Sequence, residues 1–216
     1  MVEKKLFELT SESKINFLGI RIFRIKALVK GKYYEKGEVG GWVESIELKN
    51  GDARVYGDAW VSGNAEVSGD AWVSGNARVY GDAWVSGNAE VSGNARVYGN
   101  AEVYGDAWVY GDAWVSGNAE VYGNARVSGN AEVYGDAWVS GDAEVSGNAE
   151  VYGDAWVYGD ARVYGDAEVS GRFDLTVNID FDLPRIKINT KEKLEKLKKF
   201  LEEYDKDKKS SQKVRR

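Results

Sequence analysis

The chain has 216 residues, a formal net charge of −6, 26 glycines, one proline, and neither histidine nor cysteine. These absences exclude disulfides, thiolate zinc sites, cysteine nucleophiles and the imidazole that most enzymes use as a general base. The N-terminal residues lack the apolar segment of a secretory signal, and no apolar run approaches the ~18 residues of a membrane span, so a cytoplasmic location is the default expectation.

Residues 1–50 are predicted to form an N-terminal β cap. Residues 20–29 alternate between apolar and polar side chains for several positions, as a half-buried strand does. The segment Gly-Gly-Trp-Val at 40–43 is a degenerate copy of the repeat that follows. A cap is expected because the open end of a repeat structure exposes strand edges that invite end-to-end stacking.

Twenty consecutive hexapeptides of the form Gly-[Asp/Asn]-Ala-[Trp/Glu/Arg]-Val-[Ser/Tyr] occupy residues 51–170 without insertion or deletion. Ala and Val are separated by one residue, so in a strand both point inward and the variable residue between them points outward. The other three positions have turn chemistry, because Gly tolerates a positive φ and Asp or Asn bonds to nearby backbone. A helix is excluded, since glycine every six residues matches no helical face and each would cost about 1 kcal/mol.

Three such units close a triangular coil of eighteen residues, so the block should form between six and seven stacked coils. The predicted fold is therefore all-β, a single-stranded parallel β-helix with columns of Ala and Val in its core. The repeat resembles the hexapeptide-repeat, left-handed β-helix superfamily. GNARVYGDAWV at 75–85 and GEVGGWVES at 37–45 are more narrowly similar to bacterial and phage β-helix proteins, some of them labelled acyltransferases. The left hand is implied by this resemblance alone.

Residues 171–205 are predicted to form a C-terminal cap of one strand region and one α-helix. Apolar residues alternate from Phe173 to Leu183, and Asn189 followed three residues later by Glu192 resembles a capping box. The apolar face of the helix, expected to lie across the last coil, consists of Leu194, Leu197, Leu201 and Tyr204. Residues 206–216 are polar and basic, and we expect a disordered tail.

Charge is unevenly distributed along the chain. The repeat block 51–170 carries 5 Arg against 11 Asp and 8 Glu, a net charge of −14, whereas residues 1–50 carry +3 and residues 171–216 carry +5. An acidic shaft is a poor partner for the phosphates of nucleic acid, so no nucleic acid is expected as a partner. Because no apolar run is long enough to span a membrane, no membrane is expected either. The nine-residue signature of calcium-binding β-rolls is missing, so no metal site is predicted.

Outward-facing aromatic side chains are the candidates for a binding surface. Residues eighteen apart should stack, which pairs one tryptophan with another and forms short tyrosine columns at the corners. The candidate residues are Trp138, Trp156, Tyr134, Tyr152, Tyr80 and Tyr98. Such rows can stack on sugar rings or pack against another protein. The competing interpretation is purely structural, with corner packing and cross-strand pairing as their role.

The function predicted from these observations is a non-catalytic structural or interaction scaffold without cofactor or metal. Its partner would be a protein or a glycan, and a homo-oligomer is left open. The first alternative is a carbohydrate-binding module that uses exposed Trp and Tyr. The second is an acyltransferase-like enzyme, but the acyltransferases that the repeat resembles use a histidine base, so here a buried carboxylate would have to replace it.

Overall fold

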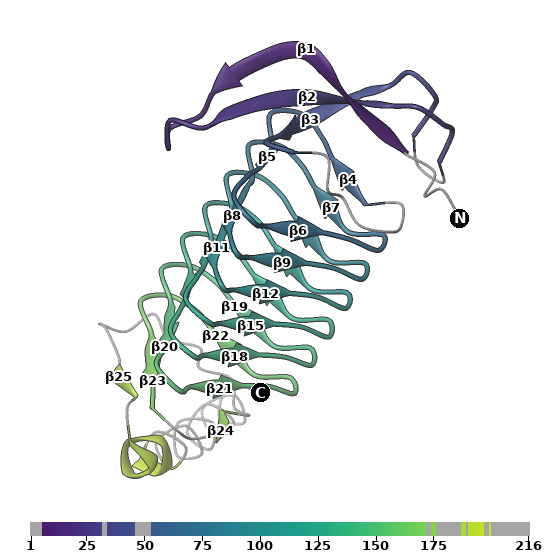
Figure 1. Cartoon of the computed structure of the whole chain (residues 1–216). Coiled ribbons are helices and arrows are strands. Elements are labelled where there is room, and N and C mark those ends of the chain that lie inside the picture. Colours follow the sequence, from purple (N-terminus) through teal and green to yellow (C-terminus); the bar gives the residue numbers. More distant parts are fainter. Residues whose placement is uncertain are drawn as a thin grey trace, which may run out of the picture.

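The computed structural model describes residues 6–31, 34–45, 53–171, 174–175, 187–188, 190–196 and 199. Most of the strand region predicted between Phe173 and Leu183, the capping residue Asn189 and the tail 206–216 lie outside this part of the chain. What is described is a three-sided shaft with a β-hairpin across its N-terminal end and a short helix near its C-terminal end (Figure 1).

Three sheets run the length of the shaft, and every repeat from 51 to 170 contributes one strand. Sheet one contains, in spatial order, β1 (Phe7–Ile15), β2 (Arg21–Ala27), β3 (Val39–Val43), β5 (Trp60–Val61), β8 (Arg78–Gly81), β11 (Arg96–Gly99), β14 (Trp114–Val115), β17 (Glu132–Val133), β20 (Glu150–Tyr152), β23 (Glu168–Ser170) and β25 (Lys187–Ile188). Sheet two contains β22 (Arg162–Val163), β19 (Glu144–Val145), β16 (Arg126–Val127), β13 (Trp108–Val109), β10 (Glu90–Val91), β7 (Trp72–Val73) and β4 (Arg54–Val55). Sheet three contains β24 (Asp174–Leu175), β21 (Trp156–Val157), β18 (Trp138–Val139), β15 (Glu120–Val121), β12 (Glu102–Val103), β9 (Trp84–Val85) and β6 (Glu66–Val67).

The coils stack in the register that the eighteen-residue period predicts. In mid-shaft, Val103 pairs with Val121 in parallel. In mid-shaft a repeat donates three backbone hydrogen bonds to the next coil, as from the amides of Glu102, Tyr104 and Asp106 to carbonyl oxygens at 2.8–3.0 Å. The Ala and Val side chains form one continuous buried cluster, nearly all of them fully inaccessible to solvent. The predicted triangular parallel β-helix is thus confirmed, and its left hand stays a prediction.

The corners depend on glycine for two reasons. Gly105 has a φ of +73°, in the left-handed region that only glycine adopts without strain. A Cβ built there would also lie 3.0 Å from the amide nitrogen of Gly123 in the next coil. Glycine therefore allows both the turn and the close approach of successive corners.

The residue that follows each corner glycine is Asp or Asn, and the asparagines among them form short ladders of side-chain hydrogen bonds. Every asparagine of the repeat block donates from its Nδ2 to the Asn or Asp eighteen residues later, at 2.8–3.1 Å. Asn100, for example, donates to Asn118, which donates to Asp136. An Asp has no donor, so each run ends where an Asp is reached.

The N-terminal cap extends sheet one. β3 pairs in parallel with β5, which confirms residues 40–43 as a degenerate first repeat, and the antiparallel hairpin β1–β2 continues the sheet beyond it. The outward position of each variable repeat residue suggests exposure to solvent, which is wrong for Trp60, because this side chain is only 5% exposed. Trp60 still lies on the outer face, but Ile22 and Trp42 pack against it and Phe17 covers it at a ring distance of 5.5 Å.

At the other end, residues 191–196 form a helix. Its first turn is capped by Thr190, whose Oγ1 accepts a hydrogen bond from the amide of Lys193 at 3.2 Å. The capping residue identified from the sequence, Asn189, lies one position earlier and outside the described residues. Leu194 is buried and belongs to the core cluster of the shaft, so this helix does pack against the solenoid.

Candidate functional site

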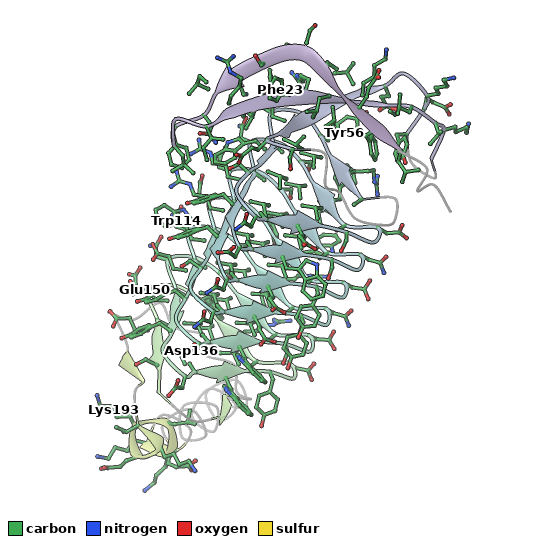
Figure 2. All side chains as sticks on the ribbon, in the orientation of Figure 1. Phe23, Tyr56, Trp114, Asp136, Glu150 and Lys193 are labelled. Carbon is green, nitrogen blue, oxygen red and sulfur yellow. The ribbon has the colours of Figure 1, made fainter. Side chains whose placement is uncertain are left out.

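The outer surface of the shaft is where the sequence varies from repeat to repeat. Strand pairing places each variable residue over another one eighteen residues away, so each sheet displays a single column of outward side chains. The columns of sheets one and two contain Trp, Glu and Arg, and the repeat positions of sheet three contain Trp and Glu. Figure 2 shows Trp114 and Glu150, both from sheet one, projecting from the shaft. The six residues predicted as binding candidates do not form one site, because Trp138 and Trp156 lie on sheet three and the four tyrosines lie beside sheet one.

The aromatic column beside sheet three consists of two stacked pairs. Tyr104 and Tyr122 stack with ring centroids 5.0 Å apart and planes 1° from parallel. Trp138 and Trp156 stack in the same way, at 5.0 Å and 2°, as the eighteen-residue spacing predicts. Tyr122 meets Trp138 edge-on at 6.5 Å and joins the two pairs. Beside them is a hollow of about 250 Å³, lined by Tyr122, Trp138, Ser140, Trp156, Val157 and Tyr158.

A second aromatic column follows sheet one from the cap to mid-shaft. Tyr80 and Tyr98 stack at 5.0 Å, which confirms their predicted pairing. Trp60 stacks on Tyr80 at 5.6 Å, and Tyr98 meets Trp114 edge-on at 6.4 Å. Sequence reasoning missed the first member, Phe17, because it lies outside the repeat and reaches Trp60 only through the fold of the hairpin.

Farther along sheet one, tyrosine hydroxyls donate hydrogen bonds to glutamates. Tyr134 and Tyr152 stack at 5.1 Å, and their hydroxyls donate to Glu150 and Glu168 at 3.1 and 3.4 Å. Burial, together with the hydrogen bond to Glu150, raises the pKa of Tyr134 to about 12. Near sheet three the same arrangement recurs, where burial and the hydrogen bond to Glu120 raise the pKa of Tyr104 well above its usual range. The hydroxyls of Tyr104 and Tyr134 therefore hold their protons more tightly than that of an ordinary tyrosine.

Arginines cover the faces of several tryptophans. The guanidinium of Arg54 lies 4.6 Å from the ring centroid of Trp72, and that of Arg96 lies 4.6 Å from Trp114. Arg126 lies 5.5 Å from the centroid of Trp108. These cation–π contacts stabilise neighbouring coils against one another, and they take up ring surface that an external ligand would need.

The acidic surface at the C-terminal end of sheet one includes an open depression of about 510 Å³ lined by Asn130, Glu132, Asn148, Glu150 and Asp166. Within the described residues, no group of three or more acidic side chains is arranged to hold a metal ion. No helix among those residues is both long and apolar enough to span a membrane.

Together these features define a capped, three-sided parallel β-solenoid whose outer surface offers ring stacking and hydrogen bonding. In comparisons with known proteins, residues 71–87, 119–135 and 125–141 match the model of a family described as the YdcK beta solenoid repeat. All three segments lie within the shaft, so the similarity concerns the repeat and neither cap. Comparison with curated proteins finds no significant match.

Proposed function

We propose that this chain is a non-catalytic interaction scaffold, a stiff shaft that presents aromatic and acidic side chains to a partner protein. The observation that carries the proposal is the division between core and surface. Ala and Val repeat unchanged through the buried columns, whereas only the outward positions vary from coil to coil. A closely packed core with a fixed period holds outward side chains at constant spacing, which suits display.

The chemistry of the surface favours binding over catalysis. An acyl transfer needs a base that removes a proton near neutral pH, usually a histidine, and the chain has none. The tyrosine hydroxyls beside Glu120 and Glu150 hold their protons more tightly than free tyrosine does. The variable-position glutamates are partly solvent-exposed, so none of them is the buried carboxylate that would have to replace a histidine base.

A protein partner is also favoured over a glycan. Sugar binding of the stacking kind needs a free aromatic face, and one arginine lies over a face of each of Trp72, Trp108 and Trp114. Trp138 and Trp156 cover one face of each other. Arginine, glutamate and tyrosine hydroxyl groups lie among these rings, which suits the mixed polar and aromatic surface of a protein interface.

Three measurements on the purified protein test the proposal. Incubation with acetyl-CoA and a panel of amines and alcohols should give no transfer, and calorimetry against a glycan panel should give no heat of binding. Selection from a displayed peptide library should enrich ligands that compete with one another for the shaft. Acyl transfer abolished by a single Glu or Asp substitution would overturn the proposal, as would glycan binding without peptide binding.

A further inference from the structure

The tyrosine column beside sheet three has a gap. The corner positions that follow its strands in successive coils are occupied by Tyr104, Tyr122, Ser140 and Tyr158. Backbone hydrogen bonds of 2.9 Å from Tyr122 to Val139 and from Ser140 to Val157 show that these corners stack directly. Ser140 has no ring, so one ring is missing between Tyr122 and Tyr158.

The gap has the dimensions of one aromatic ring. Adjacent coils lie ~4.8 Å apart, so Tyr122 and Tyr158 occupy corners separated by about 9.6 Å. In the intact part of the column, Tyr104 and Tyr122 fill successive corners with stacked rings 5.0 Å apart. A planar ring placed over Ser140 would continue the same stacking. Tyr104 covers one face of Tyr122, and Trp138 meets the same ring edge-on at 6.5 Å beside the gap.

The walls and rim of the gap add two further features. The stacked pair Trp138 and Trp156 forms a side wall, and together with Ser140 and the two tyrosines it encloses the hollow of about 250 Å³. None of the lining residues is charged. Three acidic residues neighbour this lining in the chain or in the sheet, and we call them the rim: Asp142 and Asp160 are exposed two residues after Ser140 and Tyr158, and Glu120 pairs with Trp138.

We propose that this tyrosine gap receives an aromatic side chain of a partner protein, flanked there by Lys or Arg. The proposal rests on the interaction-scaffold function and specifies the chemistry of the partner. Stacking between Tyr122 and Tyr158 selects the ring. The carboxylates of the rim select its positively charged neighbours, because complementary charge steers association and rejects acidic segments.

The test uses the full chain labelled with ¹⁵N and three blocked tripeptides. The indole N–H signals of Trp138 and Trp156 are followed by NMR during titration with lysine–tryptophan–lysine, with lysine–alanine–lysine and with glutamate–tryptophan–glutamate. Only the first should shift these signals in a saturable way. Ser140→Tyr fills the gap and should weaken binding at least tenfold, a loss of about 1.4 kcal/mol. The control Ser92→Tyr adds the same ring at a corner of sheet two and should leave the affinity within a factor of two.

A second variant keeps the test decisive if circular dichroism shows that Ser140→Tyr does not fold. Tyr158→Ser removes one wall of the gap and should weaken the lysine–tryptophan–lysine peptide several-fold. Unchanged affinity in the folded variants would overturn the proposal, as would equal binding of the alanine peptide. Methyl glucoside is titrated as a fourth ligand, and a response to it without a response to the tryptophan peptide would also overturn the proposal. Failure of the tripeptide while library peptides bind elsewhere on the shaft would reject the gap and leave the scaffold function standing.

Discussion

The glycine corners give the sharpest test of how the shaft is held together. Replacing Gly105 by Ala forces a side chain into a φ of +73°, which costs about 1–2 kcal/mol for an L-residue. The new Cβ would also lie 3.0 Å from the nitrogen and 3.2 Å from the oxygen of Gly123. Overpacking of this kind costs a further ~1–3 kcal/mol. Gly105→Ala should therefore lower the free energy of unfolding by about 2–5 kcal/mol.

Gly153 provides the matched comparison. Its φ is +64°, but the nearest atom to a Cβ there is the nitrogen of Gly171 at 3.8 Å, an ordinary contact. Gly153→Ala should therefore cost only the ~1–2 kcal/mol of the unfavourable φ. Urea unfolding followed by circular dichroism measures both losses. Equal losses at the two glycines would refute the argument that contact between successive corners limits the residue to glycine.

The difference in position between these two glycines needs its own control, because coils near the end of a solenoid can unfold locally. Val103 and Val151 lie in the same two regions of the shaft and both are fully buried. Val103→Ala and Val151→Ala should lose similar free energies if both regions unfold with the whole shaft. A much smaller loss at Val151 would show that the Gly153 result reports local fraying.

Three further predictions concern the core, a tyrosine and the amide ladder. Val103→Asp places an unpaired carboxylate in a dry column and should abolish cooperative thermal unfolding, whereas Trp108→Ser, at a side chain 45% exposed, should cost within about 1 kcal/mol; similar melting shifts would mean that the inner and outer faces are reversed. Because the pKa of Tyr134 is raised to about 12, its contribution to stability is complete below pH 10 and is lost as the pH rises toward 12; the ultraviolet titration step near pH 12 should disappear in Tyr134→Phe, and its persistence would contradict the assignment. Asn118→Asp removes the donor to Asp136 and sets two carboxylates against each other, so it should lower the melting temperature at pH 7 and less so at pH 3; an equal shift at both pH values would exclude charge repulsion as the cause.

Most of the shaft could be predicted because its period is short and strict. The alternation of Ala and Val with one residue between them specifies which side chains are buried, and the eighteen-residue coil specifies which residues stack. The pairs Trp138–Trp156 and Tyr134–Tyr152 followed directly from that spacing and are confirmed.

The features that could not be predicted depend on contacts outside the period. Trp60 has the same repeat environment as the exposed Trp84, yet it is buried because the hairpin formed by β1 and β2 folds over it. The hydrogen bond from Tyr134 to Glu150 joins a corner to the strand sixteen residues later, a direction that the stacking rule does not give. The gap at Ser140 was readable as a serine in a tyrosine column, but its significance needed the tryptophan wall beside it.

Because the interior of the shaft is invariant and its exterior varies, deleting a whole coil and deleting a single hexapeptide have different effects on the surface. Deleting a whole coil shortens the molecule without altering which side of it any remaining residue faces. Deleting a single hexapeptide, such as 111–116, would leave every inward Ala and Val in an equivalent place but turn all later residues by one third of a revolution. Trp138 and Trp156 would then face the direction now occupied by sheet one, and the amide of Asn100 would meet Asn124 in place of Asn118. Two positions of the shaft therefore face the same way only when the number of six-residue steps between them is a multiple of three.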